Sequence, residues 1–274
     1  MIAALERERY VIRGGREGFE RLKLLHRVRW PDTSDLLDLV GLQDGMRCAD
    51  LGCGGGEVTF EIAGLVGPDG HVTGFDMDEV KLELGRAAAV ERGIENVDFR
   101  AADVNDWDEP DVYDLVFCRV LLQHLSRPVD LLRRMWAAVR PGGVIAVEDV
   151  DFDGLFCDPP NDGFEFYARA FPLAIRLHGG DPTLGRKLYR YFREAGIPAA
   201  EFRVPAQRVR STGDTKTLAL ATLDATAEAM IDGGIATGEE IEAARASLAA
   251  SVADPDTVLA DPRVFQCWSR RPTA

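Results

Sequence analysis

Four glycines in a stretch of five residues constrain this chain more than any other feature of its sequence. They lie in residues 52–56, between an apolar segment that ends at Asp50-Leu51 and a helical pattern over 57–66. Glycine has no Cβ, so such a turn can adopt positive φ and can let a ligand approach its backbone closely. The backbone N–H groups at the start of the next helix point into the same space. The arrangement predicts a nucleotide-like ligand at the carboxyl end of the first β-strand.

The spacing of the glycines separates two classes of ligand. A dinucleotide fingerprint, G-x-G-x-x-G, would require glycine at position 57, where the chain has Glu57. Acids on both sides of the turn, Asp50 and Glu57, suit a ligand with an ammonium and a sulfonium better than a pyrophosphate. The segment from Asp50 to Gly56 closely resembles the first motif of class I S-adenosylmethionine-dependent methyltransferases. That resemblance implies S-adenosyl-L-methionine as the cofactor and disfavours NAD.

Strand-like and helix-like segments alternate from residue 46 onward, which is the pattern of a parallel sheet covered by helices on both faces. The segment 115–118 is apolar throughout, as expected of a central strand buried on both sides. Gly93 and Pro141 mark the ends of two helices. We expect strands near 46–51, 71–76, 97–101, 113–118 and 144–149, and helices near 57–66, 78–92 and 128–139.

The segments before and after this core have a helical pattern. Residues 1–45 predict helices interrupted at Pro31, with a second short helix over 33–40, and together they form a cap over the ligand crevice. A capping box at Thr237–Glu240 begins another helix. Beyond residue 150 we expect helices near 161–177, 184–195, 214–232 and up to about 252, a sixth strand at 200–209 and a last strand at 264–268.

This order of elements resembles the seven-stranded methyltransferase fold, with specific motifs over 46–149. The resemblance implies an α/β protein with a doubly wound, seven-stranded, mostly parallel sheet whose last strand is antiparallel. A helical cap precedes this sheet and a helical insertion precedes its last strand. The chain is most similar to ubiquinone/menaquinone-biosynthesis-type small-molecule methyltransferases. We expect one domain over 1–274, divided into a cap (1–45), a Rossmann-like core (46–209), a helical insertion (210–262) and a last strand (263–272).

The same resemblance places the cofactor contacts on the glycine turn and on the strand ends that follow it. Asp76 ends the second strand, where an acid accepts hydrogen bonds from both ribose hydroxyls. Met77 would pack on adenine, and Asp103 would accept from the adenine amino group. Tyr10 would close over the cofactor from the cap. The expected cofactor-binding residues are Tyr10, Asp50, Gly52, Gly54, Gly56, Asp76, Met77, Asp103, Val104 and Arg119.

Several of these residues have a structural alternative. Asp76 could cap the next helix, although Asp78 is better placed for that. Met77 could pack in the core, and Asp103 could be a turn residue in an Asp-rich loop. Arg119 follows the fourth strand, where its carbonyl would accept from the α-ammonium of the cofactor and its guanidinium could reach a carboxylate. Its alternative is a surface salt bridge.

Methyl transfer depends on aligning acceptor, methyl group and sulfur more than on a catalytic side chain. A base is needed only for a protonated acceptor, and His124 is the candidate because histidine titrates near neutrality. Its alternative is a structural, hydrogen-bonding histidine. Glu148 or Asp149, after the fifth strand, either faces the acceptor or lies in a solvated loop. The histidines are scattered and residues 149–160 do not match a calcium loop, so we expect no metal.

Charge and composition disfavour several classes of binding partner. The net charge of −14 disfavours nucleic acid and an anionic membrane surface. No apolar run reaches the ~18 residues of a membrane span, and the N-terminus lacks a signal-peptide pattern. Five cysteines without a C-x-x-C pair fit a cytoplasmic protein.

We therefore expect a methyltransferase that transfers a methyl group to O, N or C of a small-molecule acceptor, with secondary metabolism as one setting. Aromatic residues between 156 and 171 and the helices over 214–252 would wall the acceptor pocket, although those helices could equally form a homodimer interface or cover the core. Two other functions stay open. The protein could bind the cofactor and catalyse a non-methylating reaction, or it could be a non-catalytic binding subunit.

Overall fold

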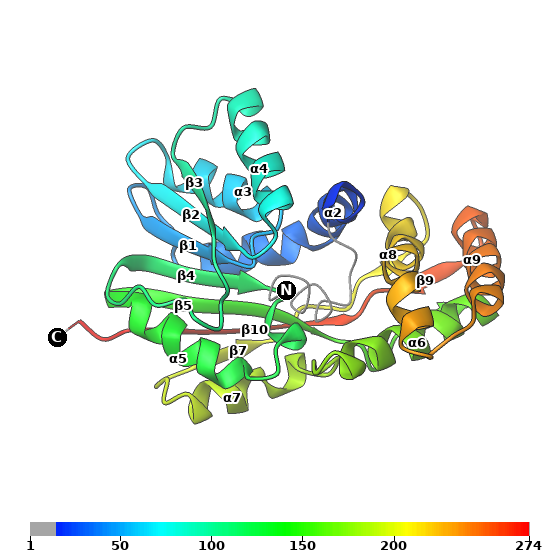
Figure 1. Ribbon diagram of the computed structural model, residues 1–274. Helices are drawn as coiled ribbons and strands as arrows, with labels where there is room; N and C mark the ends of the chain where they lie inside the picture. The colour runs from blue at the N-terminus through cyan, green and yellow to red at the C-terminus, as the bar shows by residue number, and fades with distance from the viewer. Residues whose placement is uncertain (1–14, 274) are drawn as a thin grey trace.

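The computed structural model describes residues 15–273, so the expected role of Tyr10 lies outside the described residues. The main sheet has seven strands in the order β3-β2-β1-β4-β5-β10-β7 (Figure 1). Neighbouring strands from β1 to β5 are parallel, whereas β10 is antiparallel to both β5 and β7, which confirms the expected fold class. The strands are β1 (Arg47–Leu51), β2 (His71–Asp76), β3 (Val97–Ala101), β4 (Tyr113–Arg119), β5 (Val139–Asp151), β7 (Glu201–Arg203) and β10 (Arg263–Arg270).

Helices cover both faces of this sheet, as the alternating pattern predicted. Successive side chains of a strand point to opposite faces. Leu115 and Phe117 of β4 accordingly belong to one core, and Val116 and Cys118 belong to the other. The segment 115–118 is therefore buried on both sides, as predicted for a central strand. The covering helices are α3 (Glu57–Val66) and α4 (Glu79–Arg92) on one face, and α5 (Pro128–Ala138) and α7 (Leu188–Glu194) on the other (Figure 1).

The cap is one continuous helix in its described part, α2 (Gly15–Leu39), so the predicted interruption at Pro31 is wrong. Proline inside a helix lacks the N–H of one hydrogen bond and costs about 3 kcal/mol. Here Val28 before the proline and Leu36 and Leu37 after it are fully buried. Each such burial contributes about 1.5–3 kcal/mol. The packing of both halves therefore outweighs the cost of the proline.

Strand β5 is longer at both ends than predicted. The Pro-Gly-Gly stretch 141–143 lies inside the strand, where the register with β4 shifts between the pairs Tyr113↔Val139 and Leu115↔Val144. Extra residues on one strand are accommodated as an irregularity in the ladder. At the other end β5 continues to Asp151 because β10 pairs with every residue from 144 to 151. The acids near this end therefore lie in a strand and not in a loop.

The predicted sixth strand over 200–209 is split. Pro205 lacks a backbone donor and follows β7 closely, which limits the ladder there. The rest of the segment forms β8 (Val209–Arg210), which belongs to a separate small sheet of order β6-β9-β8. The capping box of Thr237 and Glu240 is present. The other elements are β6 (Cys157–Asp158), α6 (Asp162–Leu177), η2 (Gly185–Lys187), η3 (Asp214–Thr217), α8 (Leu218–Asp232), α9 (Gly238–Ala253) and β9 (Val258–Ala260).

The helices α6, α8 and α9 pack together beside the carboxyl edge of the main sheet, and α2 lies between them and that edge (Figure 1). Their buried residues form a core of their own with β9 and the end of β5. Helix α2 contacts α3 and α4 on one side and α8 on the other. Helix α2 and the helices α6, α8 and α9 therefore surround the carboxyl ends of the strands. Within residues 15–273, no helix combines the length and apolar character that crossing a membrane requires.

Candidate cofactor and acceptor site

The glycine turn lies directly after β1 and needs glycine at three positions. Gly52, Gly54 and Gly56 have φ of 71°, 56° and 87°, a region that other residues rarely adopt. A Cβ on Gly52 would lie 2.9 Å from the Leu121 side chain, and one on Gly54 would lie 2.7 Å from Leu22 of α2. Leu121 and Leu22 can therefore pack this closely on the turn only because these residues have no side chain.

Asp76, at the end of β2, is held beside this turn by two backbone donors. Gly54 N donates to Asp76 Oδ2 at 2.8 Å, and Asp78 N donates to Asp76 Oδ1 at 2.9 Å. The cap of α4 is Asp78, which accepts from Val80 N and Lys81 N. The alternative role of Asp76 as the helix cap is therefore wrong. A carboxylate has about four acceptor positions, so Asp76 keeps capacity for two ribose hydroxyls.

Asp50 lies beneath the turn and is only 2% exposed. Thr59 Oγ1 on α3 donates to Asp50 Oδ2 at 2.8 Å. Burial raises the pKa of Asp50 to about 7, although the Thr59 hydrogen bond and the charge of Arg119 oppose this, and the charge of Asp76 adds to it. Strands β1 and β2 pair at Asp50↔Gly74, so the first two acids of the expected set lie at the ends of neighbouring strands.

The residues expected to contact adenine differ in how exposed their side chains are. Met77 is 54% exposed, so the alternative of core packing is wrong and its side chain is free to cover a ligand. Asp103 Oδ1 accepts from both Asn105 N and Asn105 Nδ2 at 2.8 Å, which shows the turn role that its alternative described. Val104 is buried in the core beneath. The adenine contacts of Asp103 and Val104 stay predictions.

Arg119 joins a buried network at the ends of β4 and β5. Its Nη1 donates to Thr33 Oγ1 at 3.1 Å, and Thr33 Oγ1 in turn donates to Glu148 Oε1 at 3.1 Å. Gln266 Nε2 donates to Glu148 Oε2 at 2.6 Å. Burial raises the pKa of Glu148, and the charge of Arg119 opposes the rise. Arg119 is thus an internal partner of α2 and acts on Glu148 of β5, and the surface salt bridge is not what the structure shows.

The residue after Arg119 is conformationally strained. Val120 has φ 54°, which is a rare backbone state for a β-branched side chain and costs about 1–3 kcal/mol. Its N–H donates to Glu148 O at 2.8 Å, which holds the chain in this turn. Such strain persists where the surrounding structure fixes a ligand-facing junction. The junction after β4 therefore has the character of a ligand site.

His124 lies in η1 (Leu122–His124), just beyond this junction, and is partly buried. Desolvation lowers its pKa to about 3, and the nearby charges of Arg21 and Lys81 add to the effect. A general base is most effective when its pKa is near the working pH. This environment favours the structural alternative, and the catalytic role of His124 stays a prediction.

The acids that end β5 are buried, so the solvated-loop alternative is wrong for them. Asp149 Oδ2 accepts from Gln123 N at 3.1 Å and Oδ1 accepts from Val150 N at 2.8 Å. Burial raises the pKa of Asp149 to about 7, and these backbone hydrogen bonds oppose the rise. Asp149 therefore ties η1 to the sheet. The described part of the chain contains no group of three or more His, Cys, Asp or Glu that could hold a metal ion.

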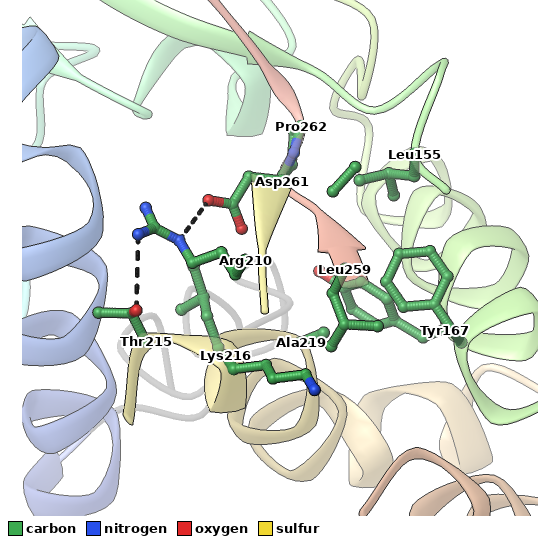
Figure 2. A pocket seen from close by; sticks show the side chains of 12 residues that line it. Leu155, Tyr167, Arg210, Thr215, Lys216, Ala219, Leu259, Asp261 and Pro262 are labelled. Carbon is green, nitrogen blue, oxygen red and sulfur yellow. Dashed lines mark hydrogen bonds and ion pairs between the residues drawn. The ribbon is translucent and has the colours of Figure 1, made fainter. Parts of the chain in front are cut away.

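A small cavity lies between α6 and residues of β8, η3, α8 and β9 (Figure 2). Arg210 Nε donates to Asp261 Oδ2 at 3.0 Å and Arg210 Nη1 lies 3.5 Å from Thr215 Oγ1. Lys216 Nζ donates to the Asp254 carbonyl at 2.6 Å. The cations of this cavity therefore already have protein partners. Its lining includes Tyr167, Arg210, Thr215, Lys216, Leu259 and Asp261, none of which belongs to the expected cofactor set.

Sequence reasoning missed three polar residues of the enclosed space: Arg29, Thr33 and Gln266. Thr33 and Gln266 reach Glu148 across 115 and 118 positions of the chain, so no local pattern pairs them. Arg29 and the preceding Val28 are both buried, but no local signal distinguishes Arg29 from the more exposed arginines of α2. Arg29 and Thr33 lie on α2 and Gln266 lies on β10, so both elements border the site.

Comparisons with known proteins show which family the chain belongs to. The family model described as a methyltransferase domain matches residues 42–196. The ubiquinone biosynthesis O-methyltransferase of Aeromonas salmonicida is 33% identical over 130 residues, which are 47% of this chain and 53% of that protein. The ubiquinone/menaquinone biosynthesis C-methyltransferase UbiE of Azotobacter vinelandii is 32% identical over 178 residues, 62% of this chain and 65% of that protein. The chain thus spans between about half and two thirds of the length of these relatives.

A solved structure extends the likeness of the fold. The structural match to the 4+2 cyclase SpnF covers 88% of this chain and 81% of the SpnF chain, with a TM-score of 0.52 and 21% sequence identity. At that identity the likeness concerns the fold alone, and a fold does not determine a reaction. The family model, by contrast, covers more than half of the chain. The chain belongs to the methyltransferase-domain family, which confirms its resemblance to class I S-adenosylmethionine-dependent methyltransferases.

Proposed function

We propose that the protein transfers a methyl group from S-adenosyl-L-methionine to an oxygen, nitrogen or carbon atom of a small-molecule acceptor. The observation that carries this proposal is the Asp76 carboxylate, which Gly54 N and Asp78 N fix beside the glycine turn. A carboxylate oriented in this way at the end of the second strand fits a ribose diol. Family membership and the two quinone-methyltransferase relatives support the same cofactor.

The residues of the site would hold the cofactor along the carboxyl edge of the sheet. The glycine turn leaves room for the amino-acid part, Asp76 accepts from the ribose, and Met77 covers the base, with Asp103 and Val104 at its edge. The Arg119 carbonyl accepts from the α-ammonium. The Arg119 guanidinium, which was expected to reach a carboxylate, is instead bound to Thr33 in this structure. These positions stay proposals for this chain.

The chemistry that the cofactor supplies when bound is an activated methyl group on a sulfonium. The protein's share is then to place the acceptor in line and to exclude water. Orientation of this kind can contribute about 7–11 kcal/mol without a catalytic side chain. Helix α2, which packs Leu22 and Phe19 onto the glycine turn, provides the cover. His124 is the candidate base for a protonated acceptor, although its low pKa would make it a weak one.

The acceptor is a small molecule that enters between α2, the strand ends and the insertion. The net charge of −14 argues against nucleic acid or an anionic membrane surface as a partner. Five cysteines without a disulfide among the described residues support a reducing compartment such as the cytoplasm. The helices of the insertion bury a core of their own, which supports a structural role for them before any role in a homodimer.

The proposal is tested in two steps with the whole chain. Isothermal titration with S-adenosylhomocysteine should show saturable binding, and a failure to bind would contradict the cofactor assignment. Labelled S-adenosylmethionine is then incubated with the protein and a metabolite extract, and methylated products are identified by mass spectrometry. Binding together with product formation supports the proposal. Binding without any labelled product would favour a non-methylating reaction or a non-catalytic binding subunit.

A further inference from the structure

Arg29 on α2 is a buried cation whose donors are not used. Its side chain is 2% exposed, and its Nε and Nη1 have no hydrogen-bond partner within residues 15–273. Removing a charged group from water without compensating interactions costs several kcal/mol. Buried polar groups in folded proteins nearly always have a partner, either in the protein or in a ligand or water. The two unused donors of Arg29 therefore point to a group that binds between α2 and the sheet.

The neighbours of Arg29 define where this group would lie. The charge of Arg29 lowers the pKa of Glu148, at the end of β5, and that of Tyr167, on α6. Thr33, one turn further along α2, contacts both the Arg29 carbonyl and Glu148. The guanidinium thus lies between the strand ends and the insertion. This is the space that the proposed function assigns to the acceptor.

The acids around Arg29 are committed to other donors. Glu148 accepts from Thr33 and Gln266, and Asp149 accepts from two backbone N–H groups. A second cation of α2, Arg21, is two turns before Arg29, and its Nε donates to Thr222 Oγ1 of α8 at 3.1 Å. Three arginines near the strand ends, Arg21, Arg29 and Arg119, are thus at least partly buried in a chain whose net charge is −14. Guanidinium groups form their strongest hydrogen bonds with carboxylates and other anionic oxygens.

We infer that the acceptor carries a carboxylate or another anionic oxygen group that binds to Arg29 in the space between α2, the end of β5 and α6. The inference rests on the proposed function and adds to it the chemical class of the substrate. Arg29 positions the acceptor by this group, and Arg21 adds a second positive charge to the same wall. Neutral molecules of the same shape would leave Arg29 buried without a partner, so they would be poor acceptors.

The cofactor also carries a carboxylate, and the neighbours of Arg29 favour the acceptor as its partner. The charges that act on Asp50, beneath the glycine turn, are those of Arg119 and Asp76. Arg29 acts on Arg119 after β4 and also on Glu148 and on Tyr167 of α6. Thr33, one turn further along α2, bonds to Glu148 and to the Arg29 carbonyl, so this part of α2 lies at the end of β5, which we assign to the acceptor.

The main test separates acceptors by charge before the reaction. A metabolite extract is divided by anion exchange into anionic and non-anionic fractions, and each is incubated with the protein and labelled S-adenosylmethionine. We expect at least ten times more labelled product from the anionic fraction. Label mainly from the non-anionic fraction would overturn the inference but leave the proposed function intact. No label from either fraction would overturn both.

Two variants on the same helix assign the preference to Arg29. Arg29→Met keeps an apolar chain of similar length, so it should fold, and its melting temperature should be no lower than that of the parent. Its labelling in the anionic fraction should fall at least about tenfold. Arg27→Met removes the same charge from the exposed side of α2, where Arg27 pairs with Asp214, and should leave labelling within twofold. Equal losses in both variants, or a melting temperature that collapses in Arg29→Met, would overturn the inference.

Titration of the cofactor fragments distinguishes the two carboxylate sources. S-adenosylhomocysteine has the amino-acid carboxylate, whereas 5′-methylthioadenosine lacks it. If Arg29 binds the acceptor, Arg29→Met should change the affinity for both by less than threefold. A loss of more than tenfold for S-adenosylhomocysteine alone would assign Arg29 to the cofactor and overturn the inference.

Discussion

The site has two halves that are held together in different ways. The glycine-turn half consists of residues 52–56 and Asp76, and the α2-and-insertion half consists of α2, the ends of β4 and β5, and the helices α6, α8 and α9. Around the turn, the decisive contacts are backbone N–H groups donating to Asp76 from residues at most 22 positions away. At the ends of β4 and β5, side chains bond to side chains, and Thr33, Glu148 and Gln266 come from distant parts of the chain. The first half positions a ligand with the backbone, whereas the second half encloses charged groups in the interior.

This difference predicts different consequences of mutation. Loss of an acid beside the turn removes a contact with the cofactor but leaves the core intact. Loss of an acid in the Thr33–Glu148–Gln266 network leaves a buried guanidinium without compensation, which affects folding itself. Substitutions in the two halves should therefore separate binding from stability.

Glu148→Ala should have the largest effect. Glu148 is fully buried, accepts from Thr33 and Gln266, and its charge acts on Arg119. Removing one member of a buried charged group costs about 3–5 kcal/mol because its partner stays buried. We expect a loss of this size in the free energy of unfolding measured by urea denaturation.

The control for Glu148→Ala is an acid in a surface ion pair. Glu79 pairs with Arg86 at 2.6 Å, and their side chains are 51% and 42% exposed. Exposed pairs contribute about 0–1 kcal/mol. Glu79→Ala should therefore change the free energy of unfolding by no more than that. Similar losses in the two variants would show that the Glu148 network is not what holds the α2-and-insertion half together.

Asp76→Ala should have the next largest effect, and on binding more than on folding. A hydrogen bond to a charged group contributes about 1.5–3 kcal/mol, and Asp76 would make two with the ribose. We expect the affinity for S-adenosylhomocysteine to fall about 100-fold, which is roughly 3 kcal/mol. Isothermal titration provides the measurement, and the free energy of unfolding should change less than in Glu148→Ala.

Asp98→Ala is the matched control for Asp76→Ala. Asp98 is an exposed acid on β3 whose partners are His71 and Arg100. Its loss changes the net charge by the same amount without touching the glycine turn. If Asp98→Ala weakened binding as much as Asp76→Ala, the contact with the ribose would have to be assigned elsewhere.

The same contrast explains how far the sequence alone could predict the structure. The bounds of β2 and β3 and of α3 agree with the predicted ranges residue for residue, because their apolar periods and glycine ends are local signals. The position of Asp76 at the end of β2 was likewise predictable, and its contact with the ribose stays a prediction. The roles of Thr33 and Gln266 were not, because each depends on a partner more than 100 positions away.

The errors of prediction also arise from long-range packing. Pro31 has a strong local preference to end a helix, yet α2 continues because its two halves are buried against different elements. The Pro-Gly-Gly stretch 141–143 lies within β5 because β4 and β10 pair with the residues around it. Nothing local predicts the positive φ of Val120, whose N–H donates to Glu148 O on the neighbouring strand. In each case tertiary contacts override a local signal.

Asp50→Asn should have an intermediate effect that depends on pH. Burial raises the pKa of Asp50 to about 7, so the folded chain holds this proton more tightly than the unfolded chain. Between about pH 4 and 7 its contribution to stability therefore falls as the pH rises. Asn mimics the protonated acid and removes this dependence. We expect the parent to lose roughly 2 kcal/mol relative to Asp50→Asn between pH 5 and pH 8.

Urea denaturation at several pH values measures this difference. Burial lowers the pKa of His124, which gives the opposite trend, but it acts in both chains and cancels in the comparison. A difference between parent and variant that stays constant from pH 5 to pH 8 would mean that Asp50 has an ordinary pKa. The pH dependence of the free energy of unfolding would then reveal no buried acid in the glycine-turn half.

Pro31→Ala should have the smallest effect and should be stabilising. Alanine restores an N–H that can donate to the Arg27 carbonyl, and Pro31 is exposed, so no packing is lost. The gain of up to about 3 kcal/mol from removing a helix-interior proline is reduced by about 0.4–1 kcal/mol because proline restricts the unfolded chain. We expect about 1 kcal/mol of net stabilisation in urea denaturation.

Pro128→Ala is the control, because Pro128 is at the start of α5, where proline is favoured and an N–H would have no helical partner. It should not stabilise the protein. The variant at Pro31 also sharpens the contrast between the two halves, because Pro31 lies between Arg29 and Thr33. If Pro31→Ala stabilises the chain and leaves methyl transfer unchanged, the proline is merely tolerated by α2. If methyl transfer falls while S-adenosylhomocysteine still binds, the local shape that Pro31 gives to α2 places Arg29 and Thr33 over the strand ends.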